Sequence, residues 1–592
     1  MAGNLPPEWR KPMKKKVLLF LAAMVFAAAS LQAVTIYPLD KAEILAGARF
    51  DFKVEFDEIQ KNVDVDVTIN GKNYSSTIGR RSALVTEKDE AGMSASALIV
   101  RDVTLPAGKY VVSAAVNGKI AKSVTWTVNE QAEQAVARNV IVLVADGLSI
   151  GHRTAARLLS RGNVEGTSQG LLNMDKMDRL GTMGTSSVDA ITVDSANSMS
   201  AYMTGHKSSI NALGVYADRT SDPFDDPKQE NLAEIIRRTT KKSIGIVSDA
   251  ELQDATPAAV VGHTRRRAEK SALMSSFLDV MPEVILGGGS AYFIPKSVQG
   301  SKRTDEINYV SEFQKAGYQF ITSNTELSKL RGIAAPDRLL GLFATGNMDG
   351  HLDRTLTKGK GWSAQFTDQP DLTTMTQVAL DVLSKNKEGF MLVVEAALVD
   401  KYTHPMDWER AVYDTIMFDK VIGIAQDFQK ENPDTLIVVT GDHTHSISVY
   451  GTVNDDRPGD RLRDKVGTYA NAGFPNYVDA DGDGYPDTPD VSIRLAVGFG
   501  NHPDYYETFK PHLDGVFAPA IANEKGDYVA NAQYKDKGIF MEGNLDYTES
   551  QEVHSVDDQL LSMSGPGSEQ VKAYQENTAV FHYIAQALGL QP

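Results

Sequence analysis

The sequence contains no cysteine among its 592 residues. This absence excludes disulfide bonds, thiol catalysis, thiolate zinc sites and a lipid-modified N-terminal cysteine. Any transition metal that the protein binds must therefore be held by histidines and carboxylates.

The chain also lacks a surplus of basic residues. It has 60 Lys and Arg against 77 Asp and Glu, which gives a formal net charge of −17. Nucleic-acid binding is not expected, because it requires a basic face. The charge suits a soluble, secreted protein but says nothing about the fold.

Long hydrophobic runs are absent too. The apolar run at 17–29 is too short to span a bilayer, and it follows three lysines at 14–16. This pattern predicts that residues 1–33 are a leader and signal peptide, removed from a periplasmic or extracellular protein with no stable membrane span. A retained membrane anchor is the alternative. Residues 1–12 do not resemble the start of a signal peptide, so Met13 is an alternative first residue and 1–12 need not be native.

Residues 34–128 alternate polar and apolar positions, as in Phe50-Asp51-Phe52-Lys53-Val54-Glu55-Phe56. Asn70-Gly71 and Asn117-Gly118 are typical of tight hairpin turns. The segment resembles an immunoglobulin-like β-sandwich without the cysteine pair of antibody domains. It holds no catalytic constellation, so we expect a spacer or packing partner. Residues 129–138 are predicted to link it to the rest.

Continuous apolar runs begin at Asn139 and predict an α/β domain over 139–592. Fully apolar strands indicate a central, mostly parallel sheet covered by helices on both faces. The runs are Val140–Ala145, Ile244–Val247, Val284–Leu286, Met391–Val394 and Leu436–Val439. Helices are predicted at Leu232–Thr240 and directly after Pro405, since proline suits a first helical position. Residues 446–550, rich in Gly, Pro, Asp and Tyr, are predicted to be an insertion over the active site.

Three of these runs end at candidate metal ligands. Asp146, Glu395 and the pair Asp442-His443 follow or close the strands, and parallel sheets bind ligands at the carboxyl ends of their strands. Ser195 lies after Asp194 in a run of small residues that let backbone amides approach an anion. It is either the nucleophile of a phosphoryl transfer or part of an ordinary polar helix N-terminus.

Six segments together resemble the bacterial alkaline phosphatases, in the same order and over most of 139–592. They are 139–147, 193–205, 250–267, 395–404, 435–445 and 554–567. The resemblance implies a secreted phosphatase with an α/β fold, two Zn²⁺, one Mg²⁺ and a serine nucleophile that forms a phosphoserine. It also implies small phosphate monoesters as substrates and suggests a homodimer.

The resemblance assigns roles residue by residue. The first zinc site matches Asp400, His404 and His554; the second matches Asp146, Asp442 and His443, with Ser195 as exchangeable ligand; the magnesium site matches Asp146, Thr256 and Glu395; phosphate contact matches Arg267, with Asp254 and Lys401 acting through water. His445 is either a supporting residue or a surface histidine. One departure lies after His554, where Ser555-Val556-Asp557 lacks the glycine usual in the family.

The chemistry of the side chains agrees with this division. Imidazole with carboxylate suits zinc, whereas an all-oxygen set suits magnesium. Asp400 and His404 are spaced to share one face of a helix, although Pro405 disfavours helix at His404 and predicts an irregular turn there.

The insertion carries a second metal-like pattern. Asp479, Asp481 and Asp483 match the start of a calcium loop, and Asp487 and Asp490 fall at its ninth and twelfth positions. An acidic turn without calcium is the alternative.

Two other functions stay open from the sequence. One is a phosphodiesterase or nucleotidase on the same metal scaffold. The other is a calcium-dependent surface-binding protein with an inactive catalytic domain.

Overall fold

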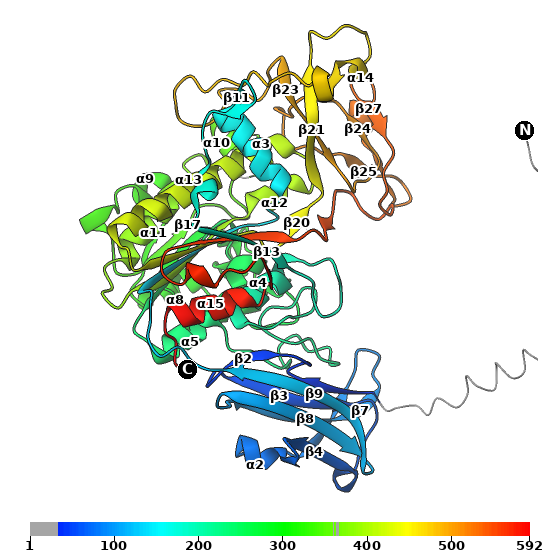
Figure 1. The fold of residues 1–592 in the computed structure, drawn as a ribbon, viewed down its shortest axis with the longest axis vertical. Helices are drawn as coiled ribbons and strands as arrows, with labels where there is room; N and C mark the ends of the chain where they lie inside the picture. The colour runs from blue at the N-terminus through cyan, green and yellow to red at the C-terminus, as the bar shows by residue number, and fades with distance from the viewer. Residues whose placement is uncertain (1–32, 359, 363–365) are drawn as a thin grey trace, which may run out of the picture.

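The computed structural model describes residues 33–358, 360–362 and 366–592 (Figure 1). The predicted signal peptide lies outside these residues, except for its last residue, Ala33. Within the described part of the chain, no helix is both long enough and apolar enough to cross a membrane.

The N-terminal part is a sandwich of two β-sheets. One has the order β1-β3-β7-β6 and the other the order β2-β9-β8-β4-β5. Phe52 and Trp126 belong to the buried core between them. Asn70-Gly71 and Asn117-Gly118 form the tight turns of the β4–β5 and β8–β9 hairpins, as predicted, with positive φ at all four residues. The strands are β1 (Val34–Tyr37), β2 (Glu43–Leu45), β3 (Phe50–Phe56), β4 (Val65–Ile69), β5 (Lys72–Asn73), β6 (Leu84–Lys88), β7 (Ser94–Val103), β8 (Gly108–Val116) and β9 (Lys119–Asn129).

The rest of the chain is built on a ten-stranded sheet with the order β16-β17-β15-β14-β18-β10-β19-β29-β13-β30. Strand β29 runs antiparallel to its two neighbours, and the other neighbouring strands are parallel to one another. The predicted mostly parallel sheet is therefore confirmed. Its strands are β10 (Asn139–Ala145), β13 (Arg179–Gly184), β14 (Ser243–Glu251), β15 (Val284–Gly288), β16 (Gln319–Ile321), β17 (Leu339–Leu342), β18 (Phe390–Ala396), β19 (Thr435–Thr440), β29 (Gln559–Ser564) and β30 (Tyr574–Glu576).

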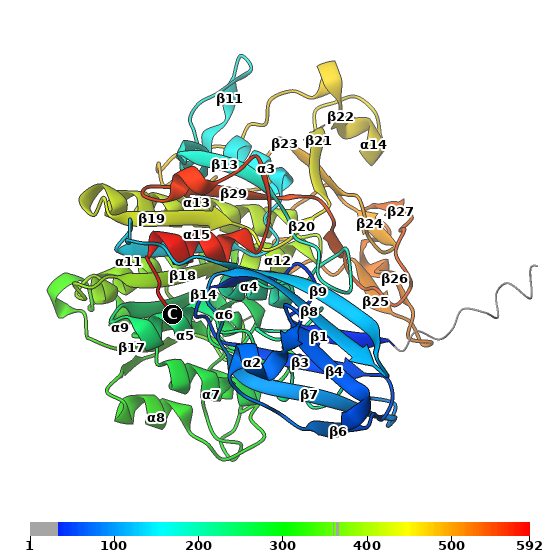
Figure 2. The ribbon, with the colours of Figure 1, turned by 60° about the horizontal axis from the view of Figure 1, so that its bottom comes forward.

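Helices cover both faces of this sheet, as the unbroken apolar strands predict (Figures 1 and 2). Alternate residues of β10 enter two different cores: Val140, Val142 and Val144 enter one, and the residues between them enter the other. The first core includes α4 (Ser195–Thr204), α5 (Leu232–Thr239), α6 (Ala255–Ala259), α7 (Lys270–Val280) and α15 (Ala579–Ala587). The second includes α3 (Ile150–Arg161), α11 (Leu372–Leu383) and α13 (Trp408–Glu431).

Residues 446–550 are mostly turns and loops with several short strands, at the end of the molecule opposite the sandwich (Figure 1). Strands β22 (Val466–Gly467), β21 (Ile447–Asn454) and β23 (Ile493–Phe499) form one small sheet, and two hairpins pair β24 (Tyr505–Glu507) with β27 (Ile539–Met541) and β25 (Ala520–Ala522) with β26 (Tyr528–Ala530). Tyr505 and Phe517 pack on Met406, two residues beyond His404. This part thus rests on the segment that follows a predicted metal ligand.

The prediction that a helix begins directly at Pro405 is wrong. Helix α12 (Leu398–Thr403) ends before the proline, and α13 begins only at Trp408. Met406 lies between them with a φ of 61°, which no helix accommodates. His404 itself keeps helical angles, and its N–H bonds the Asp400 carbonyl.

Candidate metal centre and nucleophile

The carboxyl ends of three adjacent strands meet at the centre of the sheet. Strand β10 lies between β18 and β19, and Val144 is level with Glu395 on one side and Thr440 on the other. Asp146 therefore leaves β10 beside Glu395 and beside Asp442 and His443, as expected for a parallel sheet. Gly147 makes this junction tight, because a Cβ there would stand 2.5 Å from the His445 ring.

The first cluster contains Asp400, His404 and His554, together with His445, and its ligand atoms all lie within 4.8 Å of one another. The Nε2 atoms of His404 and His554 are 3.1 Å apart. Each ring donates its Nδ1–H to a backbone carbonyl, His404 to Glu552 and His554 to Val193. Two bare Nε2 lone pairs thus face each other beside the Asp400 carboxylate, an arrangement that a cation stabilises.

The second cluster contains Asp146, Asp442 and His443, again within 4.8 Å. His443 Nε2 is 3.1 Å from Asp146 Oδ1 and 3.5 Å from Asp442 Oδ2. Asp442 Oδ2 is buried and accepts no hydrogen bond from the described residues. Burial and the Asp146 carboxylate raise the pKa of Asp442 well above its usual value. Both observations fit a bound cation.

Ser195 is the first residue of α4, and its hydroxyl enters the second cluster. Its Oγ lies 3.3 Å from Asp146 Oδ1 and 3.3 Å from His443 Nε2. Asp194 is the N-cap of the helix and accepts the Asn197 N–H. The two interpretations of this stretch are therefore compatible, since Asp194 caps the helix while Ser195 faces the candidate metal ligands.

The third predicted set is buried like the second cluster, with which it shares Asp146. Thr256 is fully buried on α6, which packs against β18, and its Oγ1 has no hydrogen-bond partner among the described residues. Glu395 accepts a hydrogen bond from Ser248 Oγ. Burial and the neighbouring Asp146 raise the pKa of Glu395 well above its usual value. An unpartnered hydroxyl near crowded carboxylates fits a hard cation such as magnesium.

Two basic side chains stand beside these carboxylates. Arg267 donates to Asp194 Oδ2 at 3.1 Å and to Asp254 Oδ1 at 2.8 Å. The Lys401 ammonium lies 3.1 Å from Asp400, 3.5 Å from Asp254 and 3.9 Å from Asp146. The residues predicted for zinc and phosphate thus lie close together, and Thr256 lies on a helix that packs against the strand of Glu395.

Three supporting residues were missed or left open by the sequence. His445 is buried and bridges Asp400 Oδ1 at 2.8 Å and Glu552 Oε2 at 2.5 Å, so it is not a surface histidine. Glu552 also accepts from His404, and Ser248 donates to Glu395. Their only sequence signal is proximity to a ligand, since Glu552 precedes His554 by two residues and Ser248 closes an apolar run.

The predicted calcium loop is only partly gathered. Asp479, Asp481 and Asp483 have carboxylate oxygens within 4.8 Å of one another. Asp487 accepts the Ala480 N–H, whereas Asp490 forms an ion pair with Lys510 at 3.2 Å. Calcium binding stays a prediction from the spacing, and the twelfth position does not join the other carboxylates.

Comparisons with known proteins agree with this geometry. A family model described as alkaline phosphatase matches residues 137–590, well over half of the chain. Alkaline phosphatase H of Pseudomonas aeruginosa is 30% identical over 368 residues, which cover 56% of this chain and 74% of that protein. The tissue-nonspecific isozyme of Gallus gallus is 28% identical over 502 residues, 78% of this chain and 86% of that protein.

Solved structures show the same fold at low identity. Thermus thermophilus alkaline phosphatase superposes with a TM-score of 0.54 at 22% identity, covering 78% of this chain and 93% of that one. The enzyme of the Antarctic bacterium TAB5 gives 0.52 at 20% identity, covering 77% and 99%. With the family model spanning the whole central sheet and every clustered ligand, the chain belongs to the alkaline phosphatase family.

Proposed function

We propose that the protein is an exported, metal-dependent alkaline phosphatase that hydrolyses small phosphate monoesters through a phosphoserine at Ser195. Family membership supports phosphatase activity. One observation carries the finer proposal: Ser195 Oγ lies within 3.3 Å of Asp146 and His443 at a helix N-terminus, with Arg267 held next to it by Asp194.

The clustered residues fit the metals that the resemblance implies. Asp400, His404 and His554 would hold one zinc ion, Asp146, Asp442 and His443 the other, and Asp146, Thr256 and Glu395 a magnesium ion. Bound zinc supplies a Lewis acid that lowers the pKa of a hydroxyl and stabilises a leaving alkoxide. A histidine-to-aspartate variant of TAB5 alkaline phosphatase is described with magnesium in its M3 site, which supports a third site in this fold.

The chain's own residues divide the work as follows. Ser195 Oγ loses its proton and attacks phosphorus, and the alcohol departs in line with it; water then cleaves the phosphoserine ester. The Arg267 guanidinium can hold two nonbridging oxygens at once. The N-terminus of α4 adds partial positive charge where the phosphoryl group sits.

Arg267 favours a dianionic monoester over a diester, because a diester offers one negative charge fewer to the guanidinium. A phosphodiesterase or nucleotidase remains the alternative. Export rests on the predicted signal peptide and the acidic charge, and a homodimer stays a prediction from the resemblance.

The test compares Ser195→Ala with Ser198→Ala, a buried serine on the same helix without a hydrogen-bond partner among the described residues. Wild-type protein should hydrolyse a chromogenic monoester faster than the matching diester and stop after zinc chelation. Ser195→Ala should lose most of the turnover yet keep its zinc, while Ser198→Ala keeps both. A phosphoenzyme trapped at low pH on any other residue, or a preference for the diester, would reject the proposal.

A further inference from the structure

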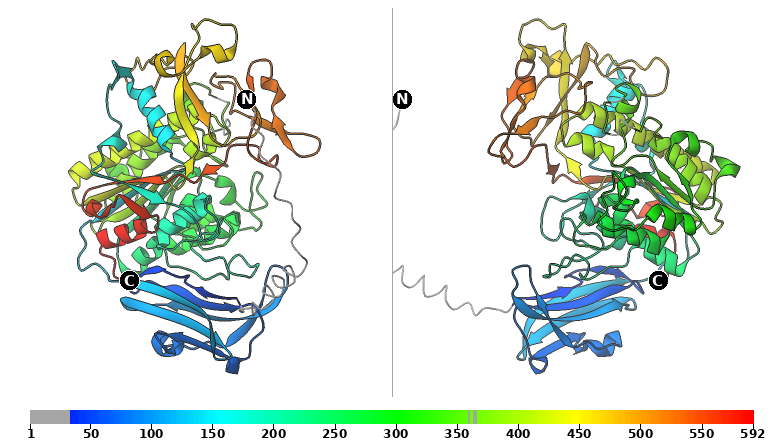
Figure 3. Two further views of the ribbon diagram at one scale, coloured as in Figure 1. Left: turned by 45° about the vertical axis from the view of Figure 1, so that its right-hand side comes forward. Right: turned by 180° about the vertical axis from the view of Figure 1, so that it is seen from behind.

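The β-sandwich packs against the catalytic part through a loop that lies between the two. We call residues 206–230, which connect α4 to α5, the junction loop (Figure 3). Gln229 forms a β-bridge with Phe50 of the sandwich, and Asp51 exchanges two hydrogen bonds with Lys228 at 2.8 and 2.9 Å. The loop thus extends the sandwich's own hydrogen bonding.

A buried ion pair holds the two parts together. Lys53 of β3 is fully buried, and its ammonium lies 2.5 Å from Asp218 of the junction loop, 2.8 Å from Glu87 and 3.2 Å from Glu55. Charges removed from water in this way have little freedom to rearrange, because each depends on the others for solvation.

Further sandwich residues bind the loop backbone. Arg101 donates to the carbonyls of Asp225 and Asp226, and its other contact is Asp51. Arg219 of the loop donates in the other direction, to the Phe56 carbonyl at 2.6 Å.

On its far side the junction loop holds the phosphate-binding segment. Leu213 and Thr264 exchange backbone hydrogen bonds at 2.7 and 2.9 Å. The Asn211 carbonyl accepts the Arg267 N–H at 2.8 Å, and the Asn211 N–H bonds Asp194, the residue that also binds the Arg267 guanidinium. The backbone and one partner of Arg267 therefore depend on the loop.

The sandwich also touches this segment directly. Glu90, in the turn between β6 and β7, lies 3.4 Å from Arg265 and 3.5 Å from Arg266. These exposed pairs are weak by themselves, but they show that the sandwich reaches the residues next to Arg267.

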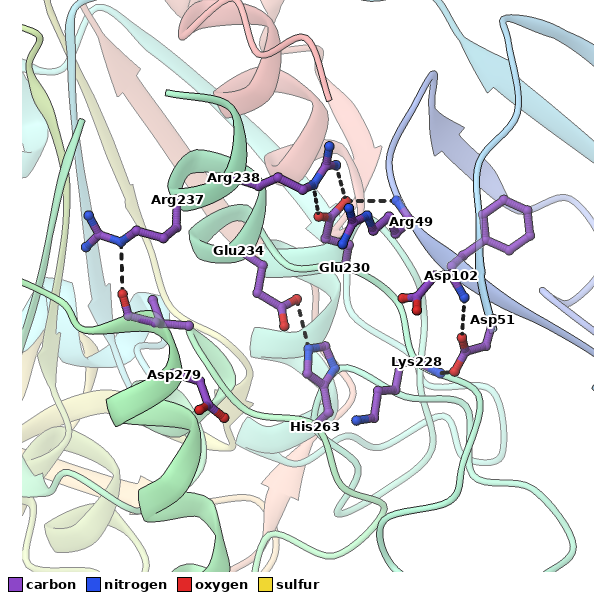
Figure 4. Close-up of a pocket in the computed structure, with 12 residues that line it drawn as sticks. Arg49, Asp51, Asp102, Lys228, Glu230, Glu234, Arg237, Arg238, His263 and Asp279 are labelled. Carbon is purple, nitrogen blue, oxygen red and sulfur yellow. Dashed lines mark hydrogen bonds and ion pairs between the residues drawn. The ribbon is translucent and has the colours of Figure 1, made fainter. Parts of the chain in front are cut away.

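Apolar and polar contacts both join the two parts: Leu45 and Ala48 belong to the catalytic core, and the rings of Tyr37 and Tyr216 lie 5.6 Å apart. A cleft of about 480 Å³ opens at the junction and is lined from both sides (Figure 4). Two of its basic side chains are paired within it, Arg238 with Glu230 and His263 with Glu234.

We propose that the N-terminal sandwich is a positioning element for phosphate: through the junction loop it fixes Arg267 and Asp194 beside Ser195. This inference rests on the proposed function of the same site. None of the ligands proposed for zinc and magnesium lies in the loop, so phosphate affinity depends on the docking, and zinc and magnesium content does not.

The experiment uses the full-length, zinc- and magnesium-loaded protein and compares variants across the junction with matched variants inside the sandwich. Asp218→Asn and Glu87→Gln each remove one carboxylate from Lys53, but only Asp218 crosses the junction. Arg101→Gln and Arg80→Gln each remove a guanidinium, and Arg80 bonds the Asp102 carbonyl within the sandwich. The readouts are KM and kcat for a chromogenic monoester, Ki for inorganic phosphate, and bound metal.

Both junction variants should raise KM and the phosphate Ki about 3- to 10-fold at unchanged metal content, below the roughly 100-fold cost of a 1 Å misplacement. The two controls should keep wild-type values. If Asp218→Asn fails to fold, Arg101→Gln, whose side chain is partly exposed, decides the matter. Folded junction variants with wild-type KM and Ki would overturn the inference; a wild-type protein without monoester turnover would instead reject the proposed function.

Discussion

At the scale of single residues, hydrogen bonds behind the ligands set the chemistry of the centre. His404 and His554 each donate the Nδ1–H to a backbone carbonyl, which fixes the tautomer and leaves the Nε2 lone pair for a metal. Asp400 is shared among His404, His445 and Lys401. Burial alone would raise the pKa of Asp400, but His404 and Lys401 hold it well below its usual value. The Asp400 carboxylate is therefore kept ionised, and these three contacts fix its orientation.

The choice of metal at the third site should depend on Asp254 and Lys401. Asp254 has only oxygen atoms, and the protonated Lys401 ammonium has no lone pair with which to bind a metal. The site therefore provides only oxygen ligands and water, which favour magnesium. Asp254→His or Lys401→His adds an imidazole, which favours zinc. We expect either variant to take up more zinc and to need more added magnesium, with metal affinity or activity changing by about 10–100-fold.

Metal analysis after dialysis against mixed zinc and magnesium measures this. Lys302→His is the matched control, because Lys302 pairs with Glu251 outside the cluster. Three zinc ions and no magnesium in the wild type would show that the site is misassigned.

The sequence could predict those residues of the site whose role only a few residue types can fill. Few side chains suit a metal, but taken singly Asp146 could be a strand-end cap and His443 a core histidine. Both of these, and His554, were assigned through the resemblance to alkaline phosphatases. Glu552 and Ser248 could not be singled out, because carboxylates and hydroxyls are common. Only the fold shows that these two face His445 and Glu395.

At the scale of elements, strand register explains why the ligands converge. The runs beginning at Val140, Met391 and Leu436 become β10, β18 and β19, whose ends are level. Apolar runs are sufficient to predict such strands, because both faces are buried. Pro405 predicted an irregular turn at His404, but the departure from helical geometry comes at Met406 instead. Its place was not predictable in the same way, because Met406 packs against residues about 100 positions later in the chain.

The acidic loop at 479–490 gives an element-scale prediction. Asp479, Asp481 and Asp483 repel one another unless a cation lies among them. Calcium should therefore stabilise the folded state by about 2.7 kcal/mol at a hundredfold excess over Kd, and this raises the temperature of the thermal transition. Asp481→Ala should abolish the response in a thermal-shift titration.

Asp490→Ala provides the control, since Asp490 is paired with Lys510 instead; this variant should respond like the wild type. An equal calcium response in Asp481→Ala would show that the loop is an ordinary acidic turn.

At the scale of the whole molecule, docking buries charge that the sequence pattern places in solvent. The alternation in 50–56 indicates a strand with one polar, exposed face, yet all seven residues of β3 are buried. Asp51, Lys53 and Glu55 face the junction loop instead of water. Periodicity predicts which residues share a face; it cannot tell whether another part of the chain covers that face.

Stability of the junction should depend on pH through Asp226, a buried residue of the junction loop. Burial and the nearby Asp218 and Asp225 carboxylates raise the pKa of Asp226 to about 7, against the opposing effects of the Asp218 N–H and Arg265. The folded state therefore binds a proton that the unfolded chain has released above about pH 4. Stability from this group is lost as pH rises from about 4 through 7.

Asp226→Asn removes the buried charge, so its thermal transition should rise by about 1–4 °C at pH 8 and by less at pH 5.5. Asp222→Asn, an exposed residue of the same loop, should change neither value. Equal shifts at both pH values would contradict the assignment.

The positions of the ligands along the chain also govern when the protein can act. Among the residues of the two candidate zinc clusters, Asp146 comes earliest in the chain and His554 comes latest. His554 lies on β28 (His554–Ser555), which pairs with β20 (Thr444–His445). Because the chain is synthesised from its N-terminus, the first strands of the sheet exist long before His554 has been made. A chain that does not yet include His554 thus carries the nucleophile without a complete centre, and phosphate chemistry waits until that histidine has been made and folded into place.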